Sequence, residues 1–112
     1  MDGKVPAYQT MMPVVIEALQ FFNGETKNSK IDNYTFKKLG IDLEHVKKFK
    51  AQIKWSRTYL KKFGFITNPK HGYWKLNRKY KSCDVETIKQ LIKEKSKEYY
   101  SQDFRKKREN IK

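Results

Sequence analysis

The sequence predicts a single, mostly α-helical domain that carries one small β-hairpin. Apolar residues recur at helical spacings of three and four over most of the 112 residues. Proline and glycine interrupt this pattern between two short runs that are rich in aromatic and β-branched residues, which is typical of a hairpin. The apolar share of 38% and the aromatic share of 14% exceed what a disordered, highly charged chain carries. A chain of this length has room for one such domain.

Two helices are expected in the first part of the chain. Residues 8–22 place their apolar side chains on one helical face, and Asn23 and Gly24, which tolerate positive φ, end this helix. A shorter helix is expected to begin at Ser29, which together with the acid three residues later resembles a capping box, and to stop at Gly40. Its apolar face would consist of Ile31, either Tyr34 or Thr35, and Leu39.

A third and longer helix is expected over residues 42–63, with a break near residues 47–50. Its inward positions alternate in threes and fours: Val46, Phe49, Ile53, Ser56, Leu60 and Phe63. One position after most of these residues stands a cation, and a step of about 100° around the helix places it beside the buried face. This basic stripe consists of Lys47, Lys50, Lys54, Arg57 and Lys61.

The hairpin is predicted directly after Gly64. Strands at residues 65–67 and 73–77 flank a five-residue loop, in which Pro69 fixes φ and Gly72 supplies positive φ. On the second strand Trp74 faces the same side as the leucine two residues later.

A last helix is expected to begin at the N-cap Asp84 and to extend to about Phe104. Its inward residues would be Val85, Ile88, Leu91, Ile92 and Tyr99. The basic residues 105–108 that follow are expected to be frayed or disordered. We therefore divide the chain into a domain of residues 1–81 and a C-terminal helix with a basic tail, residues 82–112, which would serve as a dimer element or as a linker.

The positive charge is concentrated in one part of the sequence. The formal net charge is +14, and residues 47–81 contain twelve Lys or Arg and no Asp or Glu. A field of this sign attracts polyanions, and double-stranded DNA is the first partner to consider. A basic amphipathic helix can also bind a membrane, but the apolar positions here are needed for a core, so we expect no membrane partner.

Several other functions are excluded by what the sequence lacks. One cysteine, Cys83, and two histidines give neither a disulfide nor zinc-ligand spacing, so we expect no cofactor and no metal. No secretory pattern or membrane-spanning apolar run is present, and we expect a cytoplasmic protein. The chain has one Glu-x-Lys, from Glu25 to Lys27, as chance predicts for its composition, and no nucleophile with a base beside it. We therefore expect no enzyme activity in this chain.

Three helices followed by a hairpin is the element order of a winged helix-turn-helix domain. Two segments, WSRTYLKKFGFI at residues 55–66 and NPKHGYWKLN at residues 68–77, closely resemble the end of the N-terminal winged-helix domain of Mrr-type restriction endonucleases. The first predicted helix is similar to that family's first helix, so the resemblance covers residues 8–77. Ser56 and His71 depart from the family's usual Ala and Arg. The resemblance implies DNA recognition within a restriction system, with the nuclease on another domain or subunit.

In such domains the third helix enters the major groove and the wing contacts the backbone. We expect DNA contacts from Lys47, Lys50, Gln52, Lys54, Arg57, Thr58 and Lys61 of the helix, and from Lys70, His71 and Lys75 of the wing. Gln52 and Arg57 are the candidates for base contacts, because the lysines engage phosphates as point charges. Trp55, Tyr59 and Trp74 are expected to pack in the seams between helix and hairpin.

Two other functions fit the same sequence. The wing or the last helix could dock an acidic partner or a second copy, which would make the chain a protein-interaction or oligomerisation domain. A small winged-helix transcription regulator would share the DNA chemistry and act as a homodimer on a palindromic site. The sequence leaves open the DNA target and any base modification that is recognised.

Overall fold

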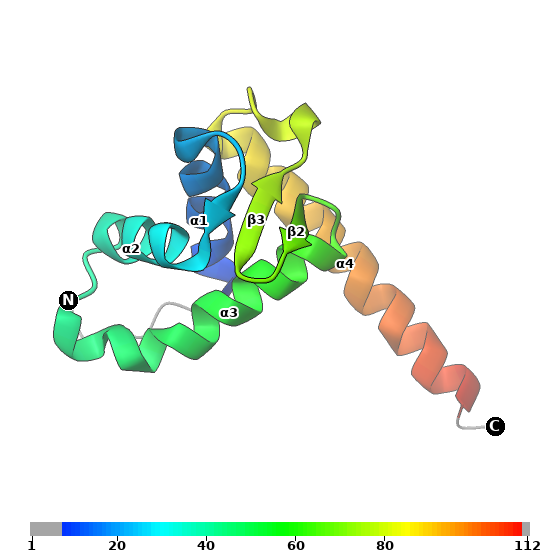
Figure 1. Ribbon diagram of the computed structural model, residues 1–112. Coiled ribbons are helices and arrows are strands. Elements are labelled where there is room, and N and C mark those ends of the chain that lie inside the picture. The colour runs from blue at the N-terminus through cyan, green and yellow to red at the C-terminus, as the bar shows by residue number, and fades with distance from the viewer. Residues whose placement is uncertain (1–7, 111–112) are drawn as a thin grey trace.

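The computed structural model describes residues 8–110, with the side chains of residues 9–42, 44–99 and 101. Over this range the chain forms four α-helices and a small antiparallel sheet (Figure 1). The main elements are α1 (Tyr8–Phe22), α2 (Asn28–Lys38), α3 (Val46–Lys62), β2 (Ile66–Lys70), β3 (Tyr73–Leu76) and α4 (Val85–Asn110). The predicted fold class is confirmed: a mostly α domain with a small hairpin, in the winged helix-turn-helix order, followed by a C-terminal helix.

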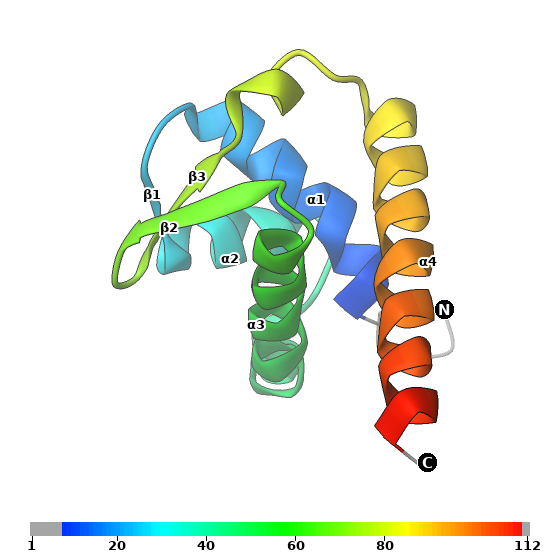
Figure 2. The same ribbon diagram turned by 90° about the vertical axis from the view of Figure 1, so that its right-hand side faces the viewer.

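Helix α1 is the centre of the core. It lies between α3 and α4 (Figure 2) and buries five large side chains almost completely, as the predicted face requires. Residues from every other layer pack around it, with Ile53 and Leu60 from α3, Leu76 from β3, and Ile88 and Ile92 from α4. The five on α1 are Met11, Met12, Val15, Ile16 and Leu19. Burying a side chain of this size stabilises a fold by about 1.5–3 kcal/mol, so this helix holds α3 and α4 together.

The sheet contains a strand that the sequence did not predict. Residues Thr26–Lys27 form β1, which pairs antiparallel with β3, so the strand order is β1-β3-β2. The hairpin turn is also tighter than the predicted five residues, since β2 continues through Pro69 to Lys70. Proline is tolerated there because β2 is an edge strand. The Asn68 side chain supports the irregular register by donating to the carbonyls of Lys70 (2.9 Å) and Tyr73 (2.6 Å).

The starts of α2 and α3 differ from the prediction. Helix α2 begins at Asn28, and the side chain of its N-cap residue, Lys27, makes no capping hydrogen bond, so the expected cap at Ser29 is wrong. Asn28 instead binds the sheet: its backbone N–H donates to the Gly72 carbonyl (2.9 Å), and its side-chain oxygen accepts from the indole of Trp74. A 3₁₀ turn, η1 (Leu43–His45), precedes α3, which then runs unbroken, so the break expected near residues 47–50 is wrong as well.

The last helix begins where it was predicted. The Asp84 carboxylate accepts a hydrogen bond from the backbone N–H of Thr87 (3.3 Å). Hydrogen bonding with the Thr87 side chain, and then with its backbone, holds the pKa of Asp84 below its usual value. Ile88 and Ile92 are buried as expected, but Val85 is 43% exposed and is not an inward residue. The helical backbone continues to Asn110, past the expected end near Phe104 and through the residues 105–108 that were predicted to fray. The side chains of that basic cluster lie outside those described.

The segment between the sheet and α4 is fixed to α1. It contains a 3₁₀ turn, η2 (Arg78–Tyr80), and the Gln20 side chain donates to the carbonyls of Tyr80 and Cys83, both at 2.9 Å. Within the described range, none of the helices has the length and apolar character needed to cross a bilayer.

Candidate nucleic-acid interface

Helix α3 presents a continuous basic surface. Its sequence contains no acidic residue, and six lysines on it are exposed to solvent: Lys47, Lys48, Lys50, Lys54, Lys61 and Lys62. Four of them, Lys47, Lys50, Lys54 and Lys61, follow one another at helical spacings on one side of the exposed face. We call these four the α3 row. Every lysine predicted for this stripe is therefore exposed.

Arg57 belongs to the same stripe by spacing, but its side chain is 7% exposed, and this position does not favour the predicted base contact. The guanidinium forms an ion pair and hydrogen bond with Asp32 of α2. It also lies 5.9 Å from the ring centroid of Trp74 on β3. Because Trp74 in turn donates to Asn28, one polar network joins α2, α3 and the sheet. Arg57 thus fixes α3 against α2 and the sheet.

Burial raises the pKa of Asp32, and the neighbouring cations oppose that shift. Arg57 opposes it most, through its charge and its hydrogen bond, and Lys50 contributes a smaller attraction. The Lys50 ammonium is therefore close enough to Asp32 to attract its carboxylate. The α3 row has one negative charge near its wing-side edge.

The other two helix residues predicted to contact DNA, Gln52 and Thr58, are less exposed than the α3 row. Gln52 is half-buried, and its Oε1 atom is shielded from solvent without a hydrogen-bond partner among the described residues. Thr58 is half-buried, and its hydroxyl donates to the Lys54 carbonyl (3.0 Å). Gln52 and Arg57 were the candidates for base contacts. Because the Arg57 side chain is buried and the Gln52 oxygen is shielded, neither exposes a full set of donors or acceptors to solvent. The exposed chemistry of α3 is mainly that of lysine ammonium groups.

The wing lies beside α3. The hairpin tip projects to one side of α3, with α4 on the other side of the molecule (Figure 2). Lys70, His71 and Lys75 are all exposed, as predicted. The Lys70 ammonium is 4.2 Å from the Tyr73 ring centroid and 4.0 Å from a carboxylate oxygen of Glu25. The tip therefore carries an acid as well as cations.

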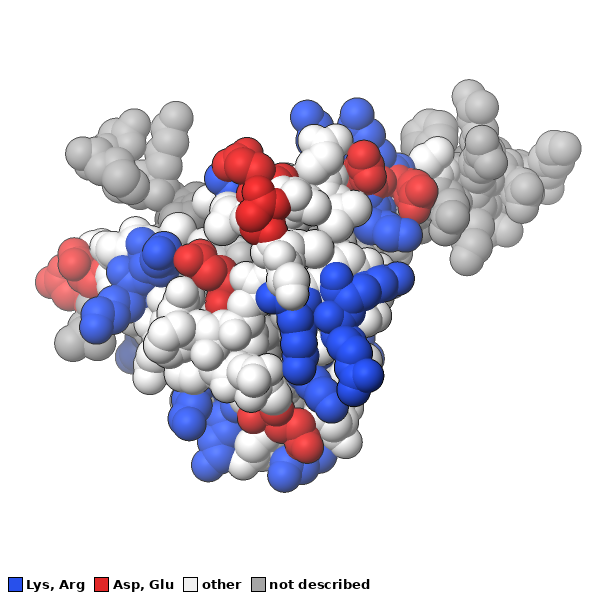
Figure 3. All heavy atoms as spheres, turned by 90° about the horizontal axis from the view of Figure 1, so that it is seen from above, with Lys and Arg blue, Asp and Glu red and all other residues white. Residues whose placement is uncertain are grey.

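The acid-free stretch of the sequence does not form one ridge in space. Six of its twelve cations are exposed on α3, two lie on the wing, and Arg57 is buried. The remaining three, Arg78, Lys79 and Lys81, are exposed in or next to η2, at the top of Figure 1, whereas α3 is at the bottom. Figure 3 views the molecule from that top side, where basic side chains form separate groups with acidic ones among them. The α3 row and the wing tip are the part of the stretch that is brought together.

The aromatic residues of α3 are only partly in the core. Tyr59 and Trp74 are half-buried, as expected for seam positions, but Trp55 is 53% exposed, and its predicted packing is wrong. Trp55 stacks on Tyr59 at 5.9 Å between ring centroids, and Tyr59 in turn meets Tyr99 of α4 at 5.8 Å.

The predicted contact set omitted three exposed α3 residues with large side chains: Trp55, Lys48 and Lys62. A plot of the full helical wheel, extended beyond the single basic stripe, would have placed all three outside the buried face. The Lys62 ammonium lies 5.5 Å from the Tyr59 ring centroid, and it donates to the Tyr99 hydroxyl at 3.4 Å. The Lys62 ammonium is therefore less available to a ligand than the ammonium groups of the α3 row.

The described charged residues of the site form a surface and do not converge as metal ligands. In the part of the chain that the structure describes, no three His, Cys, Asp or Glu residues converge on a point that could hold a metal ion. The glutamate and lysine of the Glu-x-Lys match flank the threonine of β1, and this lysine is the N-cap residue of α2. What the geometry offers is a cationic surface suited to an extended anion.

Comparison with known proteins places the chain in a family. The family model for the Mrr N-terminal domain matches residues 8–84, which covers α1 to the residue before α4. Neither the search of curated proteins nor that of solved structures gave a significant match. The matched segment contains the whole three-helix and wing unit, with the α3 row and the hairpin tip, and it confirms the resemblance carried by the residues of α3 and the wing. The chain belongs to the Mrr N-terminal domain family.

Proposed function

We propose that this domain binds double-stranded DNA and supplies target recognition to an Mrr-like restriction system. The observation that carries the proposal is the α3 row: four exposed lysines on one side of a helix without acids, next to a wing with further cations. In helix-turn-helix proteins the corresponding helix enters the major groove. Family membership supports the same assignment, because the matched unit is the N-terminal domain of Mrr.

Lysine-rich contacts of this kind position the protein more than they read sequence. The predicted adenine contact of Gln52 is not favoured by its half-buried position, and Arg57 is committed to Asp32. We therefore expect most of the affinity to come from phosphates. If about six phosphates are neutralised, the logarithm of the binding constant should fall against the logarithm of salt concentration with a slope near −5.

Fluorescence anisotropy with a labelled duplex, repeated over a range of salt concentrations, tests the proposal. The charge reversals Lys54→Glu and Lys61→Glu, combined in one variant, should weaken binding by at least about tenfold, because repulsion replaces two phosphate contacts. The matched control is Lys79→Glu with Lys81→Glu next to η2, which changes the net charge by the same amount at exposed positions at the other end of the molecule from α3. A salt slope near zero, or equal losses in both variants, would refute binding through this face.

A further inference from the structure

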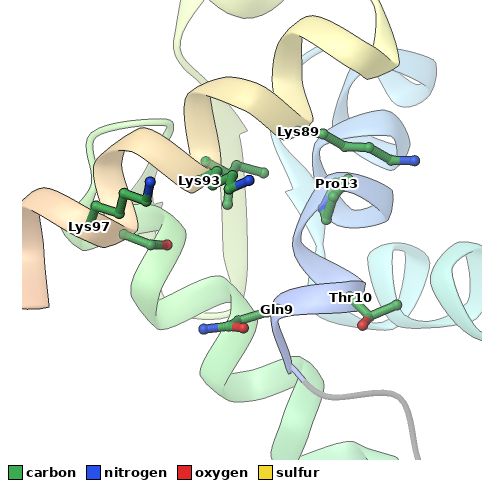
Figure 4. Close-up of a pocket in the computed structure, with 8 residues that line it drawn as sticks. Gln9, Thr10, Pro13, Lys89, Lys93 and Lys97 are labelled. Carbon is green, nitrogen blue, oxygen red and sulfur yellow. The ribbon is translucent and has the colours of Figure 1, made fainter.

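A groove of about 680 Å³ lies between the first turns of α1 and the middle of α4 (Figure 4). Its α1 wall consists of Gln9, Thr10 and Pro13, and its α4 wall is formed largely by Lys89, Lys93 and Lys97. These residues take no part in the α3 surface. In Figure 2 the first turns of α1 and helix α4 lie on the other side of the molecule from the hairpin tip, so the groove and the DNA-facing surface can be occupied together.

The α4 wall is a row of positive charges. The three lysines are spaced four residues apart, which places them on one helical face over roughly 12 Å. All three are exposed, and Lys89 lies 3.9 Å from the carboxylate of Glu86. Lys93 and Lys97 have no ion-pair partner among the side chains that the structure places. None of the described residues that line the groove is acidic, so the row can attract an anionic ligand.

Gln9, Thr10 and Ser96 are polar residues of the lining, but most of the surface that the groove exposes is apolar. Ile92 is 6% exposed and contributes to the floor, Pro13 contributes its ring, and lysine stems add methylene surface. A nucleic-acid backbone does not need such a floor, because its contacts are made by basic and polar groups. An apolar strip that runs beside a row of cations is instead complementary to an amphipathic segment with carboxylates beside its apolar residues.

Pro13 adds a hydrogen-bonding feature at the α1 end. It lies inside α1 and has no N–H, so it cannot form the helical hydrogen bond to the carbonyl of Gln9, four residues earlier. Gln9 lines the groove, so its backbone carbonyl lacks its usual helical donor at this place. A polar donor on the ligand would find an acceptor there.

We infer that the groove between α1 and α4 docks an acidic amphipathic segment of a partner protein. Its apolar side chains would rest on Ile92 and Pro13, and carboxylates three or four residues apart would face Lys93 and Lys97. This is a protein-docking function of the domain, separate from the proposed DNA binding, and it uses different residues.

The test uses a displayed library of random peptides, two to four helical turns long (roughly 7–14 residues), panned on the full chain. Ser96→Trp, which fills the groove from α4, serves for counter-selection, and Thr10→Trp fills it from the opposite wall. We expect the selected peptides to be acidic, with apolar residues three and four apart. Their affinity, measured by anisotropy, should fall about tenfold, or about 1.4 kcal/mol, in the double variant Lys93→Glu with Lys97→Glu.

The control for net charge is Lys79→Glu with Lys81→Glu beside η2, which should leave peptide affinity within about twofold of the original protein. Circular dichroism measures whether each tryptophan variant is folded. Because the two variants fill the groove from opposite walls, the test remains decisive if one of them fails to fold. The inference is overturned if the peptides bind the blocked proteins equally, if no acidic sequence is enriched, or if a DNA duplex displaces them. It is also overturned if the chain dimerises and Ser96→Trp abolishes the dimer, because the groove then holds a second copy.

Discussion

Arg57 marks the limit of what periodicity in one helix can say about a single residue. Its spacing from Lys54 and Lys61 puts it on the basic stripe, and the stripe is exposed at its other four positions. The pattern of α3 contains no information about the facing helix α2, which carries Asp32, the ion-pair partner of Arg57. A long side chain at the edge of a stripe can point outward to solvent or inward to the neighbouring helix. An opposite charge on that helix favours the inward orientation.

Removing Arg57 should destabilise the domain far more than it affects DNA binding. The variant Arg57→Met leaves the Asp32 carboxylate buried without its cation, and we expect a loss of about 3 kcal/mol in the free energy of unfolding near neutral pH. Urea denaturation followed by circular dichroism measures this. In an Asp32→Asn background the same change should cost clearly less, since no buried charge remains, and an equal cost in both backgrounds would contradict the assigned pairing.

The loss caused by Arg57→Met should depend on pH in a defined direction. Burial raises the pKa of Asp32 above its ordinary 3.8, and Arg57 opposes this, so its removal raises the folded-state pKa further. Between the unfolded and folded pKa values the native state then binds more protons, so stability increases as pH falls. The destabilisation measured at about pH 7 should therefore shrink at about pH 4.5. A loss that is constant or larger at the lower pH would exclude this explanation.

Trp55 provides an internal reporter for the proposed interface. It is 53% exposed between lysines of α3, whereas Trp74, the second tryptophan, is half-buried against Arg57 and Asn28. Adding duplex DNA should change the intrinsic fluorescence of the original protein, and this change should be largely lost in Trp55→Phe. Because an exposed side chain contributes little to the core, that substitution should shift stability by less than about 0.5 kcal/mol. A signal that persists in Trp55→Phe would place the ligand elsewhere.

At the scale of elements, the start of α2 shows why a local capping signal failed. Ser29 matched the sequence pattern of a cap, but Asn28, one residue earlier, already starts the helix and binds the hairpin through Gly72 and Trp74. Asn28→Ala should cost about 1–2 kcal/mol, because the half-buried indole N–H loses its acceptor. Ser29→Ala should be nearly neutral, although an N-cap serine would cost about 1 kcal/mol. Thermal unfolding of both variants distinguishes the two, and the reverse ranking would restore Ser29 as the cap.

The elements that sequence located well are those whose signal lies within the element. The apolar faces of α1 and α3 and the cap of α4 at Asp84 follow from spacing and local chemistry, and all are confirmed. The missed strand depends on a contact across the fold. Thr26–Lys27 form a strand of two residues because β3 lies beside them, and that partner is not visible in a local window. The irregular end of β2 is a local feature, where the Asn68 side chain donates to the carbonyls of Lys70 and Tyr73.

At the scale of the whole molecule, the acid-free run of 35 residues is no longer surrounded by positive charge alone once the chain folds. Asp32 from α2 neutralises Arg57, and Glu25, next to β1, approaches Lys70, so acids from the earlier part of the chain enter the basic region. The cluster at Arg78, Lys79 and Lys81 is carried to the other end of the molecule. Charge order in the sequence therefore predicts an anionic partner, while the topology determines which cations lie close to one another.

A charge-matched pair of variants separates a local DNA site from the effect of net charge. Lys54→Gln with Lys61→Gln and Lys79→Gln with Lys81→Gln each remove two positive charges at exposed positions. If binding is made by the α3 row, the first pair should lower the magnitude of the salt slope by about two, since each lost phosphate contact changes it by about one. The second pair should leave the slope unchanged and reduce affinity only slightly, through the long-range field. Equal slopes in both double variants would mean that DNA responds to the total charge of the domain, and the α3 row would then not be its binding surface.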